Sequence, residues 1–98
     1  MGMIIREHDV FSKWFGEQND DVVVVITRRL ARVSLGNFGN SKSVGGGVSE
    51  LKIEYGKGFR IYYTIRGLEI VLLLCGGHKG SQKRDIKLAQ ELNKEVQK

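Results

Sequence analysis

Between residues 48 and 75, three consecutive segments have the residue pattern of β-strands, and short glycine-containing turns separate them. Val48–Tyr55 and Phe59–Arg66 alternate apolar with polar residues, which is typical of strands with one buried face. Leu68–Cys75 is apolar on both faces, which predicts a central strand. Connections this short join antiparallel neighbours. The chain is therefore expected to contain a small antiparallel sheet.

Two helices are predicted before these strands. Asp9 is the expected N-cap of a short helix that runs through Trp14 and Phe15. Asp20 or Asp21 is the expected N-cap of a longer one. Aspartate suits these positions because its side-chain oxygen accepts a hydrogen bond from a free N–H of the first turn.

The longer helix contains a conflict between propensity and periodicity. Val22–Ile26 is β-branched throughout and by itself favours a buried strand. The apolar residues continue at steps of three or four to Leu30 and Val33, with the arginines elsewhere around the turn. The periodicity predicts a helix that ends near Ser34.

The remaining segments are predicted to be a short strand, a loop and a C-terminal helix. Met3–Arg6 is apolar and is expected to form an edge strand. Gly36–Gly47 is rich in glycine, asparagine and serine, and is predicted to be a loop. Ser81 is the expected N-cap of the last helix. The apolar stripe of that helix consists of Ile86, Ala89, Leu92 and Val96.

Composition places the chain among small basic proteins. Its 98 residues carry 16 Lys and Arg against 11 Asp and Glu, a net charge of +5, and are expected to form one domain over 1–98. This balance favours a polyanionic partner, either nucleic acid or an acidic protein segment. The single cysteine, Cys75, cannot form an internal disulfide, and the longest apolar run, Ile70–Cys75, is too short to span a membrane. We therefore expect a cytoplasmic protein without a membrane partner.

The strand register follows from matching apolar faces. A three-residue turn at Gly56–Gly58 sets Lys52 opposite Tyr62 and Glu54 opposite Arg60. A slip of two residues would preserve the faces, whereas a slip of one would exchange them. The sequence thus predicts that Arg60 lies on the polar face.

The second hairpin brings further cations to the same place. Closing it at Arg66-Gly67 sets Leu73 opposite Arg60, so the strand that ends at Cys75 finishes beside the first turn. Cations from three stretches of sequence are expected there: Lys57, Arg60, His78 and Lys79, with Lys52 one strand pair further in.

Each of these residues has a structural as well as a functional interpretation. Arg60 is either a cross-strand partner of Glu54 or a phosphate clamp, since a guanidinium presents a planar fork of donors. On an exposed sheet face, its replacement by alanine is expected to leave the fold intact. Tyr62 is either an ordinary strand aromatic or a stacking platform for an RNA base. His78 is either a polar loop residue or a proton carrier.

Together, the cations next to a tyrosine are typical of an RNA phosphodiester site. The 2′-OH of RNA attacks its own 3′ phosphate when one group takes its proton, another stabilises the phosphorane and a third protonates the leaving 5′ oxygen. Lysine and arginine supply the charge stabilisation, so this chemistry calls for no metal or cofactor. His8, His78 and Cys75 have no metal-ligand spacing.

The sequence also resembles a known family. The matching residues are Leu35-Gly36-Asn37-Phe38-Gly39, Val44-Gly45, Gly47-Val48, Glu50-Leu51, Gly56, Gly58-Phe59-Arg60-Ile61-Tyr62-Tyr63, Leu73-Leu74-Cys75-Gly76-Gly77-His78-Lys79, Ser81-Gln82 and Asp85-Ile86. This pattern is similar to that of the RelE/ParE toxin superfamily, and more narrowly to its HigB-like addiction module killer protein branch.

The resemblance implies an α+β fold, with two N-terminal helices packed on a small bent antiparallel sheet and a helix at the C-terminus. It also implies a type II toxin neutralised by a cognate antitoxin in a hetero-oligomer. For the RelE and HigB members, the activity is cleavage of mRNA in the ribosomal A site, which inhibits translation.

The resemblance implies that Arg60 matches the arginine that family members use on the scissile phosphate. By position, Lys52 and Lys57 match basic residues that contact RNA, and His78 and Lys79 match the basic segment after the last strand. No tyrosine follows Tyr63, so the general base is not supplied by the resemblance. Two alternatives stay open: a ParE-like toxin that inhibits DNA gyrase without cleaving RNA, and a non-catalytic RNA-binding or regulatory module.

Overall fold

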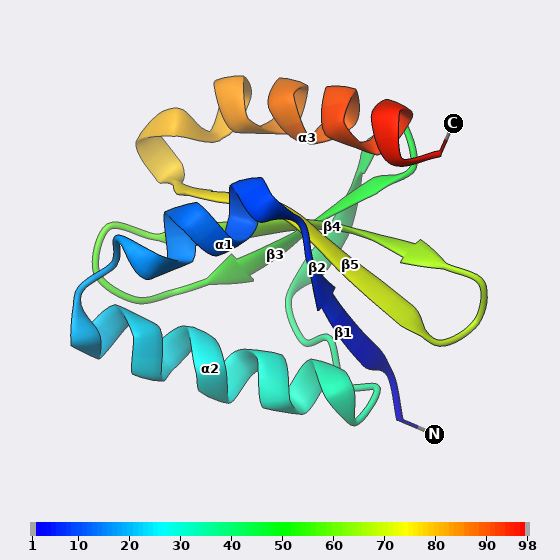
Figure 1. The fold of residues 1–98 in the computed structure, drawn as a ribbon. Coiled ribbons are helices and arrows are strands. Elements are labelled where there is room, and N and C mark those ends of the chain that lie inside the picture. Colours follow the sequence, from blue (N-terminus) through cyan, green and yellow to red (C-terminus); the bar gives the residue numbers. More distant parts are fainter. Residues whose placement is uncertain (1, 98) are drawn as a thin grey trace.

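The computed structural model describes residues 2–97. It shows an α+β fold in which one five-stranded sheet carries helices on both faces (Figure 1). The strands are β1 (Ile4–Glu7), β2 (Ser41–Gly45), β3 (Val48–Ile53), β4 (Phe59–Arg66) and β5 (Ile70–His78). The helices are α1 (Asp9–Gly16), α2 (Asp20–Ser34) and α3 (Gln82–Val96), and a 3-10 turn, η1 (Lys79–Ser81), precedes α3. The predicted fold class is confirmed.

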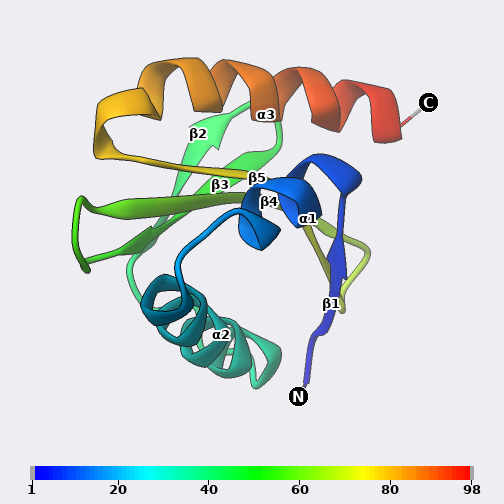
Figure 2. The ribbon, with the colours of Figure 1, turned by 60° about the vertical axis from the view of Figure 1, so that its left-hand side comes forward.

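The sheet is centred on β5. Its strand order is β1-β5-β4-β3-β2. The pairs β3–β4 and β4–β5 are antiparallel as predicted, and β2 is also antiparallel to β3. The edge strand β1 runs parallel to β5, which adds one parallel pair to the sheet. Helices α1 and α2 cover one face, and α3 covers the other (Figure 2). Because β5 is buried between two strands and two helical layers, it is apolar on both faces.

The two faces of the sheet belong to two separate apolar clusters. The cluster under α1 and α2 contains Phe11, Val22, Ile26, Val33, Leu51, Ile53, Phe59, Ile61, Tyr63, Val71 and Leu73. The cluster under α3 contains Val48, Tyr62, Leu74, Cys75, Ala89 and Leu92. Cys75 is a core residue, and burial raises the pKa of its thiol to about 12. The face predicted to be polar is therefore largely covered by a helix.

The helix boundaries correct two of the predicted caps. His8 is the N-cap of α1, and its Nδ1 accepts a hydrogen bond from the Val10 N–H at 3.0 Å. Asn19 precedes α2, so Asp9 and Asp20 lie in first turns, where their charge suits the helix dipole. Ser81 is the N-cap of α3 as predicted. No helix within residues 2–97 is long and apolar enough to cross a membrane.

The predicted loop Gly36–Gly47 is wrong in its second half, because Ser41–Gly45 forms strand β2 on the edge next to β3. An edge strand needs only backbone pairing and little apolar surface, so its side chains did not reveal it. Gly46 and Gly47 adopt φ angles of 64° and 77° in the hairpin turn that follows. Asn93 of α3 donates a hydrogen bond to the Gly46 carbonyl at 2.9 Å and fixes this turn.

Both predicted registers are also corrected. Lys52 lies opposite Arg60, not Tyr62, because five residues instead of three connect β3 to β4; this two-residue shift preserves the faces. Arg60 pairs with Gly77, not Leu73. Part of the second shift comes from a bulge at Leu74, since Tyr62 pairs with Cys75 and Tyr63 with Leu73. Bulges and longer turns leave no clear mark on an apolar–polar pattern.

Two consecutive glycines of β5 allow α1 and α3 to approach the sheet closely. A Cβ added to Gly76 would overlap the Trp14 ring of α1, and one added to Gly77 would overlap the Asp85 carboxylate of α3. Neither glycine has a positive φ, so the requirement is for space and not for backbone freedom. These two positions therefore set how closely both helical layers pack against the central strand.

We predict that Gly76→Ala lowers the free energy of unfolding by about 3 kcal/mol or more, because the added methyl group cannot be placed without moving Trp14. Urea denaturation followed by tryptophan fluorescence measures the loss. Gly16→Ala is the matched control, because a Cβ there meets no atom within 4 Å. A Gly76→Ala protein as stable as the control would contradict this account of the packing.

Candidate functional site

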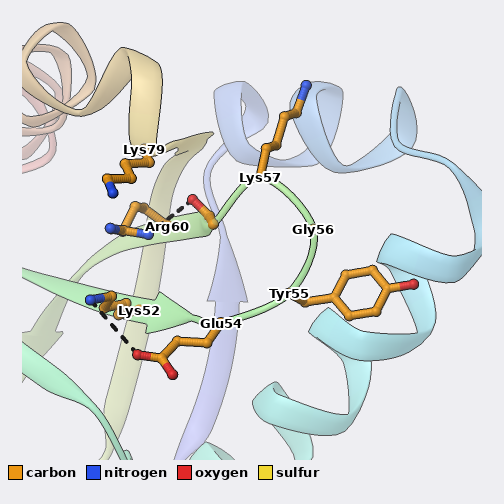
Figure 3. Close-up of a pocket in the computed structure, with 8 residues that line it drawn as sticks. Lys52, Glu54, Tyr55, Gly56, Lys57, Arg60 and Lys79 are labelled. Carbon is orange, nitrogen blue, oxygen red and sulfur yellow. Dashed lines mark hydrogen bonds and ion pairs between the residues drawn. The ribbon is translucent and has the colours of Figure 1, made fainter.

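A pocket of about 520 Å³ opens where β3, β4, their connecting loop and η1 meet (Figure 3). Its lining residues are Lys52, Glu54, Tyr55, Gly56, Lys57, Gly58, Arg60 and Lys79. Four of the six residues predicted from the sequence, Lys52, Lys57, Arg60 and Lys79, thus belong to one pocket. The cations outnumber the single lining carboxylate, so the pocket favours an anionic ligand.

One backbone carbonyl connects Arg60 to Lys79. The Gly58 carbonyl accepts hydrogen bonds from Arg60 Nη1 at 2.9 Å and from the Lys79 backbone N–H at 2.8 Å. Gly58 has a φ of 76°, which a residue with a Cβ rarely adopts. The glycine therefore holds the β3–β4 loop against η1 and brings the two cations to the same wall of the pocket.

Lys52 reaches the pocket from the neighbouring strand. Its Nζ lies 3.8 Å from Glu54 Oε1, and both side chains are well exposed. Its backbone carbonyl accepts a hydrogen bond from Arg29 Nη1 of α2 at 2.6 Å. Burial, and next the charge of Arg32, lower the pKa of Arg29. The sequence does not reveal this supporting role, because the helical period places Arg29 with the other arginines, away from the apolar stripe.

The side chains in the pocket point in different directions. Figure 3 shows the charged ends of Lys52, Arg60 and Lys79 on the same side, whereas Lys57 extends away from them. Tyr55 turns towards α2, where its hydroxyl donates to Asp21 Oδ2 at 2.7 Å. The structure thus brings three cations together at the pocket and leaves Lys57 at its rim.

Arg60 is buried, which corrects the expectation that it lies on an exposed face. The residue is 5% exposed, and its Nε lies 3.7 Å from Glu50 Oε1. Its ionic partner is therefore Glu50, not the predicted Glu54. For the same reason Arg60→Ala is expected to destabilise the fold, since the change would leave a buried carboxylate without its cation.

Tyr62 is not available as a stacking platform. It is fully buried under α3, and its hydroxyl donates to Glu50 Oε2 at 3.3 Å. Burial, and then the neighbouring Glu50 carboxylate, raise the pKa of Tyr62 well above its usual value, so the phenol stays neutral. The structural interpretation of this tyrosine is correct, and the RNA-stacking interpretation is not.

His78 lies beside the site in sequence but does not line the pocket. It is the N-cap of η1, and its Nδ1 accepts a hydrogen bond from the Gly80 N–H at 3.0 Å. In the neutral ring this bond places the proton on Nε2, which leaves no free nitrogen to act as a base. The pattern of a glycine-rich turn before a helix start was the signal for this capping role.

A second, smaller pocket of about 280 Å³ adjoins the first and shares Lys52 and Arg60 with it. Its other lining residues are Asn40, Lys42, Glu50 and Gln82. Glu50 alternates with the apolar residues of β3, and this alternation does not reveal that its side chain is buried. Only the position of α3 shows that this face is covered.

The fold and the two adjoining pockets define a small α+β protein with a surface rich in cations. The model of the family described as "Phage derived protein Gp49-like (DUF891)" matches residues 13–94, and the chain belongs to this family. An uncharacterized protein of Haemophilus influenzae is 40% identical over 97 residues, which cover 98% of each chain.

The fold is also that of a known toxin. A solved structure of a double mutant of the Escherichia coli toxin RelE in the free state matches with a TM-score of 0.71. The alignment covers 89% of this chain and 92% of that one at 14% identity. The α+β fold that the resemblance to the RelE/ParE superfamily implied is confirmed by this match.

We predict that Arg60→Ala lowers the free energy of unfolding by about 3 kcal/mol or more, because Glu50 is then buried without a counter-charge. Lys79→Ala, at an exposed position of the same pocket, should stay within about 0.5 kcal/mol of the unchanged protein. Urea denaturation monitored by circular dichroism tests both. Equal stability of the two variants would contradict the assignment of a buried ion pair.

Proposed function

We propose that this protein is the toxin of a type II toxin–antitoxin system and a ribosome-dependent mRNA endoribonuclease that inhibits translation. The observation that carries the proposal is the convergence of Lys52, Arg60 and Lys79 on one pocket. Such a group of cations suits a phosphodiester whose negative charge increases during the reaction. The RelE fold supports a toxin, and the cation-lined pocket supports an RNA substrate.

In the proposed reaction, the 2′-OH gives its proton to a water molecule and attacks the adjacent phosphorus, which forms a 2′,3′-cyclic phosphate as the bond to the 5′ oxygen breaks. Arg60 contacts the phosphate, because its guanidinium is a permanent positive charge with N–H donors suited to phosphate oxygens. Lys52 contributes a second positive charge at the pentacoordinate phosphorus. Lys57, at the rim, contacts the RNA backbone further along. The positive charge of these side chains supplies the stabilisation, so the proposed step involves no metal or cofactor.

We assign protonation of the leaving oxygen to Lys79 and not to His78. Lys79 lines the pocket, whereas His78 does not, and the Nδ1 of His78 is committed to Gly80. The initial interpretation of His78 as proton carrier thus gives way to a structural role in holding η1, on which Lys79 is presented.

The same surface also suits the proposed antitoxin partner. An acidic antitoxin segment would be attracted by the basic pockets, and binding there would exclude RNA. We therefore propose a toxin–antitoxin hetero-oligomer in the cytoplasm, with the antitoxin and the ribosome-bound mRNA as alternative partners.

We predict that induction of the protein in bacterial cells produces new mRNA 5′ ends at ribosomal A-site positions, and that Lys79→Ala reduces their number at least 100-fold. The expected loss follows from the removal of a general acid. Sequencing of mRNA 5′ ends measures it. Lys87→Ala is the matched control, because this exposed lysine lines neither pocket.

The alternatives give other results. Arrested replication with intact mRNA would favour a gyrase-inhibiting toxin. Retention on RNA without new 5′ ends would favour a non-catalytic binding module. Either result would overturn the endoribonuclease proposal.

We also predict that His78→Asn cleaves mRNA within about threefold of the unchanged protein, because the asparagine oxygen can still accept the Gly80 N–H. Single-turnover cleavage on programmed ribosomes measures the rate. His78→Ala, which removes the acceptor, should lower the thermal midpoint. A loss of 100-fold or more in His78→Asn would return the role of proton carrier to His78.

A further inference from the structure

The buried carboxylate of Glu50 has no role in the reaction proposed above. Glu50 lies on β3 and is 2% exposed, although its side chain forms part of the second pocket. A carboxylate in such a place is costly unless donors and positive charge surround it. Its contacts therefore show what the fold uses it for.

Groups from two other elements hold Glu50 in place. Gln82, the first residue of α3, donates from Nε2 to Glu50 Oε2 at 2.7 Å. The Tyr62 hydroxyl of β4 donates to the same oxygen at 3.3 Å. With Oε2 engaged by both donors, Oε1 is directed to Arg60, whose Nε lies 3.7 Å away.

Arg60 uses its donors unequally. Nη1 donates to the Gly58 carbonyl at 2.9 Å and approaches the Phe59 carbonyl at 3.4 Å. Nε is buried and has no hydrogen-bond partner among the described residues, because 3.7 Å to Glu50 Oε1 is too long for a hydrogen bond. Glu50 thus compensates the charge of Arg60 without using the Nε donor.

We infer that Glu50 is a positioning residue, which faces the buried Nε of Arg60 and so orients the guanidinium for contact with a phosphate oxygen of RNA at the pockets that Arg60 lines. This inference rests on the proposed function for the identity of the ligand. Glu50 is not assigned an acid or base role, because it is buried and its Oε2 already accepts from two donors. Gln82 of α3 helps to orient Glu50, since it donates to the Glu50 oxygen that does not face Arg60.

A double-mutant cycle tests whether Glu50 acts through Arg60. Glu50→Gln should lower the single-turnover cleavage rate on programmed ribosomes at least tenfold. In an Arg60→Lys background, which keeps the charge but lacks the planar fork, the same change should cost less than twofold. Glu91→Gln, an exposed carboxylate on α3, is the control. Equal fold-losses in both backgrounds would overturn the inference, because they would indicate a general structural effect.

A second measurement does not depend on cleavage. The ¹⁵N–¹H signal of Arg60 Nε, assigned by its absence in Arg60→Lys, should shift in Glu50→Gln. If Glu50→Gln does not fold, Gln82→Ala serves in its place, because it removes only the 2.7 Å donor and should move the same signal. An unchanged signal in the folded variant would overturn the positioning role.

The two arms separate this inference from the proposed function. A wild-type protein without cleavage, in which the Arg60 Nε signal still responds to Glu50, would refute the nuclease and keep the positioning role. Cleavage by the wild-type protein, together with an Nε signal that does not respond to Glu50, would support the nuclease and overturn the positioning role.

Discussion

The close approach of two helices to opposite faces of β5 is the constraint on which the other features depend. Gly76 and Gly77 supply the space, with the Trp14 ring against one face and the Asp85 carboxylate against the other. A central strand that packs this tightly fixes where α3 begins and therefore where η1 presents Lys79. The interior of the fold and the geometry of the candidate site are thus set by the same two residues.

Helix α3 covers the second face of the sheet and buries two opposite charges there. Once α3 is in place, Arg60 and Glu50 are both buried, and each requires the other because an unpaired charge there would strongly destabilise the fold. Arg60 is 5% exposed, and its Nε has no hydrogen-bond partner among the described residues. Donors that are already oriented suit stabilisation of a transition state, because they need no reorganisation when charge develops.

Backbone hydrogen bonds hold the segments that carry the cations around Arg60. The Gly58 carbonyl accepts hydrogen bonds from the Arg60 side chain and the Lys79 backbone N–H. Arg29 donates a hydrogen bond to the backbone carbonyl of Lys52. Apart from the Arg60 side chain, these bonds hold backbone groups of the residues that carry the cations, so they add no negative charge to the pocket. This arrangement leaves the charge available for the phosphate or acidic partner that we propose, while the exposed Lys57 contributes from the rim.

The sequence by itself determined the fold class, the helical state of the valine-rich segment, the three successive strands and the gathering of Lys52, Lys57, Arg60 and Lys79. Periodicity and short turns are local properties, and matching apolar faces tolerates a two-residue slip without moving a side chain to the other face. Only the tertiary structure decided the β2 pairing, the bulge at Leu74, the burial of Tyr62 and the partnership of Arg60 with Glu50. These depend on where α3 lies across the sheet, and a polar residue under a helix has the same sequence pattern as one in solvent.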